Sequence, residues 1–340
     1  MKNRILIAAG LAVASSLFLA GCNPAVPDGS PADTGTTDGS PVNVSIATQP
    51  WIGYGPWQIA VEKGFDTDHG VKLDLITFNT DSDMISAFGS GRVPLADAAL
   101  NTSAVYSTAG QDVSNVLIQA VTTTADAVMA GPGLDTAESL RGKRVAFEEG
   151  ATSDILIRDY LATAGMTLDD ITVVGTPASS AGAALLSGGV DAAVTYEPYL
   201  SATLGEGSDL QVVHTAAETF GLITDALLVN PDWAKENSET LENVLLAWND
   251  AVEFFEQNPT EGQTIITTAI GADPAEFAET FKGIQLMTLT ASNEFFADDY
   301  GPVADVLKNL WQTSGDAALA EVDLAGIADP SFGEAALARR

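Results

Sequence analysis

Aromatic side chains and glycine stand where strands of the chain are expected to end. Trp51, Gly53 and Tyr54 follow the first apolar run after the N-terminal region, and Tyr196 follows a later run of small residues. In open α/β sheets ligands bind beyond the carboxyl ends of the strands, so these loops are candidate pocket walls. Glycine lets backbone and ligand approach closely, and aromatic rings can wall a cleft. Packing of the same aromatic loop into the core is the alternative.

Two acidic residues stand near these aromatic positions in the expected fold. Glu197 directly follows Tyr196, and Asp126 stands a few residues after the apolar run that ends at Val121. Together with Trp51 they would suit an ammonium or amide group, through charge and cation–π contact. The alternative for Glu197 is structural, because an acid at a helix start is favoured by the helix dipole.

Hydroxyl, amide and acidic residues also stand where three helices are expected to begin. Unpaired N–H groups at a helix start can hold a sulfonate, nitrate or carboxylate, so these clusters are candidate ligand contacts. Simple capping explains the same residue types equally well, and both interpretations stay open. The clusters are Thr80 with Asp81, Asn101 with Thr102, and Thr152 with Ser153.

The sequence lacks the residue sets that catalysis usually requires. Its only histidines are His69 and His214, and no His-Glu-x-x-His, Gly-x-Ser-x-Gly or phosphate-loop pattern is present. We therefore expect no enzyme activity, no catalytic residues, no metal site and no cofactor.

The N-terminus has the three-part layout of a secretory signal. Lys2 and Arg4 precede an uncharged apolar run over 5–20, which ends in small residues before Cys22. A transmembrane helix is the weaker alternative, because glycine and serine interrupt a run shorter than a usual span. We predict a signal peptide over 1–21.

Leu-Ala-Gly followed by Cys22 resembles a bacterial lipobox, in which the cysteine thiol receives a lipid. Cys22 is the only cysteine of the chain, so no intramolecular disulfide can form. The following residues are rich in Pro, Gly, Ser and Thr and have little to bury, so 22–43 is expected to be a disordered tether. The protein should then sit outside the bilayer, attached to it by lipid alone.

The chain is strongly acidic. It has 14 Lys and Arg against 46 Asp and Glu, a formal net charge of −32 at pH 7. Such a surface repels nucleic acid and anionic lipid. A saline habitat and simple solubility both explain the excess, and the composition does not choose between them.

Short apolar runs alternate with helical stretches over most of the chain. This alternation is typical of α/β folds and predicts parallel sheets with crossover helices, and the length favours two lobes. From Pro231 onward the pattern becomes mostly helical, and Leu241 to Phe255 carry apolar side chains at spacings of three and four that should pack on the sheets. The expected strands are Val44–Ala47, Val71–Ile76, Val116–Val121, Lys143–Phe147, Ile171–Val174, Ala192–Thr195 and Leu210–Val213.

An ordered series of motifs resembles a known family. Gln-Pro-Trp-Ile-Gly-Tyr-Gly-Pro-Trp begins at Gln49, Leu-Arg-Gly-Lys-Arg-Val-Ala-Phe begins at Leu140, and Gly-Val-Asp-Ala-Ala begins at Gly189, leading to Thr-Tyr-Glu-Pro. This order is similar to that of the solute-binding proteins of taurine, aliphatic sulfonate, nitrate and amide- or urea-type ABC importers. The family is related in fold to thiamine-pyrimidine synthase, which depends on a cysteine-rich segment that this chain lacks.

The resemblance implies a type II periplasmic-binding-protein fold, with two α/β lobes, a cleft between them and a helical C-terminal part. Lobe one would comprise 44–128 and 227–340, and lobe two 129–226. The implied function is capture of a small polar solute by hinge closure and its delivery to ABC permease subunits, by a protein expected to be a monomer on the extracytoplasmic face. An extracytoplasmic sensor for a membrane receptor is the alternative.

Overall fold

Two β-sheets organise the chain in the computed structural model, which describes residues 40–272 and 280–340. The first sheet has the order β11-β4-β10-β3-β1-β2, and the second has the order β7-β6-β8-β5-β9. In the first sheet the strands are β1 (Val42–Thr48), β2 (Val71–Thr77), β3 (Leu95–Ala99), β4 (Ser114–Thr122), β10 (Ile223–Val229) and β11 (Ile284–Leu286). In the second they are β5 (Asp126–Ala130), β6 (Arg144–Phe147), β7 (Thr172–Gly175), β8 (Ala192–Tyr196) and β9 (Gln211–Thr215).

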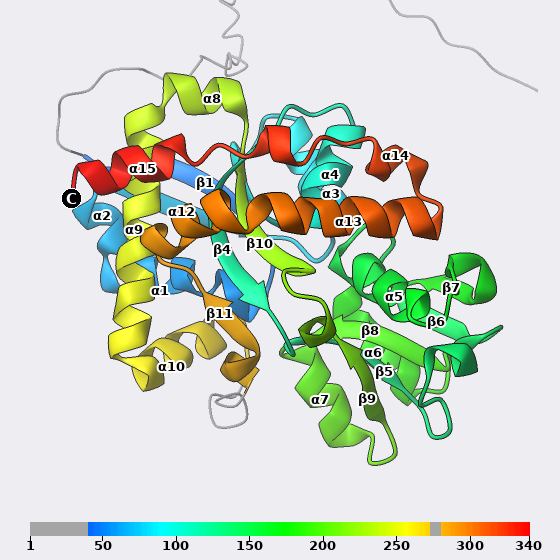
Figure 1. Ribbon diagram of the computed structural model, residues 1–340. Helices are drawn as coiled ribbons and strands as arrows, with labels where there is room; N and C mark the ends of the chain where they lie inside the picture. The colour runs from blue at the N-terminus through cyan, green and yellow to red at the C-terminus, as the bar shows by residue number, and fades with distance from the viewer. Residues whose placement is uncertain (1–39, 273–279) are drawn as a thin grey trace, which may run out of the picture. The chain divides into compact units, whose positions relative to one another are not determined.

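The chain passes between the sheets twice, from β4 to β5 through 123–125 and from β9 to β10 through 216–222. The first sheet is therefore built from both ends of the described chain, and the second from its middle, which is green in Figure 1. The lobe boundaries expected at 128/129 and 226/227 lie inside β5 and β10, a few residues beyond these two connections.

Both sheets are mixed, and they contain antiparallel strands beside the parallel strands that the sequence predicted. β1 pairs in parallel with β2 and β3, as does β6 with β7 and β8. By contrast β10 lies antiparallel between β3 and β4, and β5 lies antiparallel between β8 and β9. The cause is connectivity. Two neighbouring strands run parallel when a crossover helix carries the chain back to the starting edge of the sheet, and a strand that enters directly from the other sheet has no such helix before it.

Helices follow most strands and form the C-terminal part of the described chain. The first half contains η1 (Ile52–Tyr54), α1 (Pro56–Lys63), α2 (Phe65–Asp68), α3 (Asp81–Gly89), α4 (Leu100–Thr108), η2 (Ala137–Leu140), α5 (Thr152–Ala162) and η3 (Leu168–Asp170). The second half contains α6 (Ala178–Leu186), α7 (Tyr199–Glu206), η4 (Ala216–Glu218), α8 (Pro231–Glu236), α9 (Ser238–Gln257), α10 (Pro259–Ala269), η5 (Thr280–Gly283), α12 (Leu289–Asp298), α13 (Tyr300–Ser314), α14 (Ala317–Ala320), η6 (Ala325–Ile327) and α15 (Ser331–Ala338). Among the described residues, none of these helices is both long and apolar enough to cross a membrane.

The long helix α9 packs as its apolar spacing predicts. Leu241, Val244, Leu245 and Trp248 are fully buried in one hydrophobic cluster with the residues of β1 and α1. Trp248 also donates its indole N–H to the Met287 carbonyl at 2.9 Å, and its ring meets Trp57 of α1 edge-on. This packing fixes α1, and with it the loop that follows β1, against the first sheet.

The connection from β9 to β10 contains a glycine whose conformation and space both exclude a side chain. Gly221 has a φ of +73°, and a Cβ built there would lie 2.3 Å from Val303 Cγ2 in α13. Gly221→Ala should therefore lower the free energy of unfolding by about 2–4 kcal/mol, from left-handed backbone strain plus overpacking. Urea unfolding followed by circular dichroism measures it.

Gly133→Ala is the matched control, because Gly133 has a similar φ of +79° but a Cβ placed there would meet nothing within 4 Å. It should lose only about 1 kcal/mol, the left-handed strain alone. Equal losses in the two variants would show that the contact with α13 does not constrain this connection.

Candidate functional site

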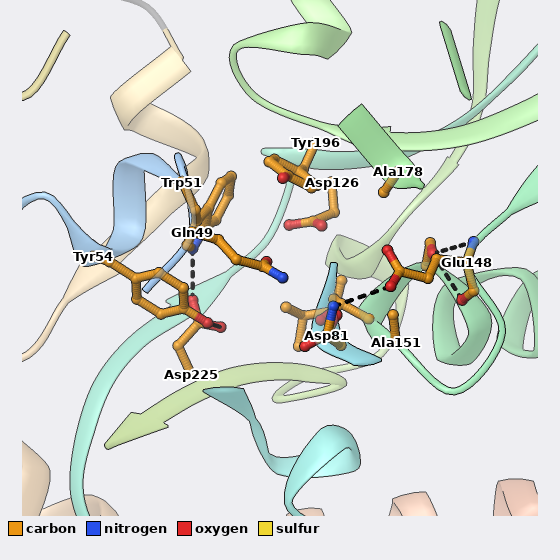
Figure 2. Close-up of a pocket in the computed structure, with 13 residues that line it drawn as sticks. Gln49, Trp51, Tyr54, Asp81, Asp126, Glu148, Ala151, Ala178, Tyr196 and Asp225 are labelled. Atoms are coloured by element: carbon orange, nitrogen blue, oxygen red, sulfur yellow. Dashed lines mark hydrogen bonds between the residues drawn. The ribbon is translucent and has the colours of Figure 1, made fainter. Parts of the chain in front are cut away.

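A pocket is lined by residues from both sheets and their loops (Figure 2). Its cavity volume is about 30 Å³, where one water needs about 10–15 Å³, so it suits a small chemical group. The lining residues of the first sheet and its loops are Gln49, Trp51, Tyr54, Asp81, Ile223 and Asp225. Those of the second are Asp126, Glu148, Ala151, Thr152, Ser153, Ala178 and Tyr196.

Asp225, in β10, is held by two aromatic side chains from the loop after β1. Trp51 donates its indole N–H to Asp225 Oδ2 at 2.8 Å, and the Tyr54 hydroxyl lies 3.3 Å from Oδ1. Gly53 makes this arrangement possible, since a Cβ there would lie 2.2 Å from Trp51 Nε1. The glycine thus lets the indole ring lie against the backbone, and both oxygens of the buried carboxyl group have a donor.

Asp126 and Tyr196 form a pair across the second sheet, in antiparallel register between β5 and β8. The Tyr196 ring meets the Trp51 ring edge-on, with centroids 5.6 Å apart, so aromatic groups of the two sheets touch at the pocket. Asp126 is only 5% exposed, and its Oδ2 has no hydrogen-bond partner. Figure 2 shows its carboxyl group directed into the space between Gln49 and Glu148.

Asp81 and Glu148 meet across the pocket from opposite sheets. The backbone N–H of Asp81, at the start of α3, donates to Glu148 Oε1 at 3.0 Å. The Ser153 hydroxyl accepts the Glu148 N–H at 3.0 Å and lies 3.2 Å from the Glu148 carbonyl, which ties this acid to the start of α5. Glu148 also interacts with the backbone of Ala178, and Asp81 with the Gln49 side chain.

Burial makes these carboxyl groups hard to ionise. It raises the pKa of Asp81 to about 7, with a further rise from the charge of Glu148, and it raises the pKa of Asp225 to about 6 against the hydrogen bonds from Trp51 and Tyr54. Burial followed by the charges of Asp225 and Glu197 raises the pKa of Asp126 well above its ordinary value. The pKa of Glu148 is raised by burial too.

A further buried acid, Asp97, is not part of the pocket lining. Asp97 in β3 accepts at Oδ1 from Trp57 Nε1 at 3.0 Å and from Gln119 Nε2 at 2.8 Å, while its Oδ2 has no partner. Burial raises the pKa of Asp97 to about 7, although these hydrogen bonds and one from Thr48 lower it. Its charge interacts with that of Asp225, so the two aspartates belong to one electrostatic cluster.

Seven residues that the sequence suggested for a binding site line this pocket together: Trp51, Tyr54, Asp81, Asp126, Thr152, Ser153 and Tyr196. Four others are not among the lining residues. Thr80 caps α3 by accepting the Asp83 N–H at 3.2 Å, and Asn101 donates to the Ala151 carbonyl at 3.1 Å. Thr102 is fully buried in α4. Gly53 has no side chain and so leaves room for the Trp51 ring, as described above.

Glu197 is also outside the lining. Its carboxyl group accepts the Ser201 N–H at 3.1 Å and the Ser201 hydroxyl at 2.8 Å, so it organises the start of α7. Successive residues of a strand point to opposite faces, and Glu197 follows Tyr196, which faces the pocket. Of the two interpretations of Glu197, the structural one describes its contacts.

Sequence reasoning missed six lining residues: Gln49, Glu148, Ala151, Ala178, Ile223 and Asp225. Glu148 directly follows a predicted strand, and the rule that selected Trp51 would have selected it as well. Asp225 gave no such signal, because its strand was not predicted. The proposed lipidation site, Cys22, lies outside the described residues, as does the signal peptide.

The four carboxyl groups surround the pocket without converging on a point. Among the described residues, no three His, Cys, Asp or Glu side chains gather closely enough to hold a metal ion. None of the lining residues is Lys, Arg or His. The pocket is therefore an acidic and aromatic enclosure.

Comparison with protein families identifies the chain. The sequence profile described as NMT1/THI5-like matches residues 52–262, more than half of the chain. The chain belongs to the NMT1/THI5-like family. It is 27% identical over 254 residues to a protein of Brucella abortus (strain 2308) that is provisionally named as a binding protein, covering 74% of this chain and 78% of that protein. It is 25% identical over 202 residues to a provisionally named aliphatic sulfonates-binding protein of Escherichia coli (strain K12), covering 59% of this chain and 63% of that protein.

Solved structures agree with this family assignment at the level of fold. The crystal structure of the periplasmic aliphatic sulphonate binding protein from Escherichia coli matches with a TM-score of 0.68 at 19% identity, covering 84% of this chain and 96% of that one. The crystal structure of a desulfurization enzyme matches with a TM-score of 0.64 at 14% identity, covering 88% and 99%. The predicted periplasmic-binding-protein fold and family resemblance are thus confirmed, while the fold by itself accommodates both binding and catalysis.

The buried acids predict an unusual pH dependence of stability. The folded-state pKa values of Asp225 and Asp97, about 6 and about 7, lie above the value of about 3.9 for an unfolded chain. Protonation therefore favours the folded state, and this stabilisation is lost as pH rises through about 6 and 7. The free energy of unfolding of the ligand-free protein should fall between about pH 5 and pH 8, as measured by urea titration at each pH.

Asp97→Asn should reduce this decrease in the free energy of unfolding by on the order of 2 kcal/mol. The amide oxygen can still accept hydrogen bonds from Trp57 and Gln119, but the side chain no longer titrates. The control is Asp232→Asn, whose side chain is 90% exposed and which should keep the wild-type slope. An unchanged slope in Asp97→Asn would contradict the buried-acid explanation.

Proposed function

We propose that this protein is the solute-binding component of an ABC-type importer, that it works on the extracytoplasmic face of the membrane, and that it encloses a small polar solute between two lobes. The observation that carries this proposal is the pocket, because both sheets contribute its walls while only two short connections join them. A solute in such a place contacts both sheets at once only when they are close together.

That arrangement supports capture by hinge closure. Contacts across the pocket, such as the Asp81 N–H to Glu148 and the edge-on rings of Trp51 and Tyr196, are weak individually and would break on opening. A solute that adds contacts to both walls shifts the equilibrium toward the closed form. The closed form then presents the surface that permease subunits recognise.

Binding rather than catalysis is supported by the chemistry of the lining and by the relatives. The described pocket contains no histidine, cysteine or lysine, and Ser153, its only serine, is engaged with the Glu148 backbone. The relatives from Brucella abortus and Escherichia coli are named as binding proteins. We propose that the solute leaves the pocket chemically unchanged, which mass spectrometry of bound and released solute tests directly.

Attachment to the membrane by a lipid on Cys22 completes the proposal. It rests on the sequence Leu-Ala-Gly-Cys at 19–22 after an apolar signal. Such an anchor would keep the binding protein near its permease without a membrane-spanning segment.

Cys22→Ser should release the protein from membranes into the soluble extracytoplasmic fraction without changing its fold. The reason is that the lipid would be the sole membrane attachment once the signal is removed. Fractionation of cells that express either form, with washing at high salt, measures the change, and circular dichroism controls for folding. A variant that still sediments with membranes would contradict lipid anchoring.

Ligand binding should make the protein more compact without changing its secondary structure. Small-angle scattering compares the radius of gyration of the ligand-free protein with that in the presence of whichever solute raises its melting temperature most. A solute at about a thousand times its dissociation constant should stabilise the protein by about 4 kcal/mol, so the screen is sensitive. A stabilising solute that leaves the radius of gyration unchanged would argue for a rigid site and against capture by closure.

A further inference from the structure

The charges of the pocket lining differ from what a sulfonate or nitrate requires. The lining has four acidic side chains and no basic one. Arg158, which lines an adjoining hollow, is already paired with Asp154 at 2.6 Å and bonded to Ser314 at 3.0 Å. An anion in this pocket would lie among carboxyl groups with no side-chain cation to balance it.

Three of the four acids already have hydrogen-bond partners. Asp225 is satisfied by Trp51 and Tyr54, Glu148 by backbone N–H groups, and Asp81 by the side chain of Gln49. Asp126 is the exception, because it is only 5% exposed, lines the cavity and keeps Oδ2 without any partner. Buried polar atoms are nearly always hydrogen-bonded, so this oxygen marks the place of a missing donor.

Aromatic side chains complete the enclosure. Trp51, Tyr54 and Tyr196 line the same cavity, and aromatic rings of this kind attract cations. A metal ion does not fit the arrangement, because within the described chain no three of these acids approach one centre. The surroundings therefore match a polyatomic cation with several N–H donors, small enough for a cavity of about 30 Å³.

Resting on the solute-binding function proposed above, we propose that the solute of this pocket carries a small cationic nitrogen head group with several N–H donors, of the guanidinium, amidinium or protonated-amine class, and that Asp126 accepts from it. The relatives named for sulfonates would then share the scaffold but not the charge of the ligand. The net charge of −32 acts in the same sense, since it attracts cations to the molecule and repels anions.

Three probes with the same number of non-hydrogen atoms separate the alternatives: methylguanidinium, tetramethylammonium and methanesulfonate. Methylguanidinium has charge and N–H donors, tetramethylammonium has charge alone, and methanesulfonate is the anion. Binding is measured by calorimetry and by protein NMR at millimolar probe, with sodium chloride at matched ionic strength as the baseline. Methylguanidinium should bind at least about ten times more tightly than either of the others, because only it can satisfy Asp126 by a charge-assisted hydrogen bond.

Asp126→Asn should weaken methylguanidinium binding by on the order of ten- to a hundred-fold, since it removes the charge while nearly preserving the shape. The control is Asp232→Asn, which makes the same chemical change at a side chain that is 90% exposed and lies outside the lining. It should leave the affinity within about two-fold. If Asp126→Asn does not fold, Glu148→Gln replaces it, because an amide oxygen there can still accept the Asp81 N–H.

Affinity should also depend on pH in a definite direction. The groups that face the solute are the carboxyl groups of Asp81, Asp126, Glu148 and Asp225 and the hydroxyls of Tyr54 and Tyr196. Burial raises the pKa of every one of them, so the phenols stay neutral, while Asp81 and Asp225, with pKa values of about 7 and about 6, lose their protons near neutrality. Cation binding should therefore tighten as pH rises from about 5.5 to about 7.5, whereas anion binding would weaken.

Failure of methylguanidinium to bind, or equal binding of tetramethylammonium, would overturn the assignment of an N–H cation. Binding of methanesulfonate with compaction in scattering would overturn it as well, yet would leave capture by closure standing. Tight binding of methylguanidinium without compaction would support the cation assignment and contradict the closure mechanism.

Discussion

Uncompensated negative charge inside the protein is the constraint on which the pocket depends. Carboxyl groups are costly to bury unless they are paired, hydrogen-bonded or protonated, and here no basic side chain lines the site. The chain responds in the same way twice within seven residues. Trp51 donates its indole N–H to Asp225 on β10, and Trp57 donates its own to Asp97 on the neighbouring strand β3. The segment after β1 is thus fixed by hydrogen bonds to two buried acids as well as by apolar packing.

Strand register explains why these two acids act together. Asp225 pairs with Ala99 and Asp97 with Leu227, so the aspartates are diagonal neighbours on adjacent antiparallel strands and lie on the same face of the sheet. The charge of Asp225 therefore raises the energy of ionising Asp97, in addition to the effect of burial. β10 can bring Asp225 to this position because it returns from the second sheet and inserts between β3 and β4. The unexpected antiparallel strand and the acidity of the site have one origin.

The sequence alone predicts most of the parallel strands and the aromatic loop after β1, because short Val- and Ile-rich runs and residues that follow a strand are local signals. It does not predict β10, whose run from Ile223 to Val229 includes an aspartate at its third position, a residue depleted in strands. Asp225 could not be chosen without that strand. Choosing between Glu197 and Asp126 likewise needed register, because only the pairing of Asp126 with Tyr196 shows which acid shares the tyrosine's face.

The family relationship and the acidity of the pocket are compatible because they reside in different parts of the structure. The match to the sulphonate-binding fold extends over most of the chain, so it reflects sheets, helices and their order. Ligand charge is decided by a few side chains at loop positions and strand ends, here Asp81, Asp126 and Glu148, which do not carry the packing of either sheet. At 19% identity such positions are free to differ while the core keeps its pattern. A scaffold that brings two sheets together around a small cavity can therefore change the charge of the solute it accepts by exchanging a few residues. The condition is that the acidic side chains can be protonated while the site is empty, as the raised pKa values of Asp81 and Asp225 allow.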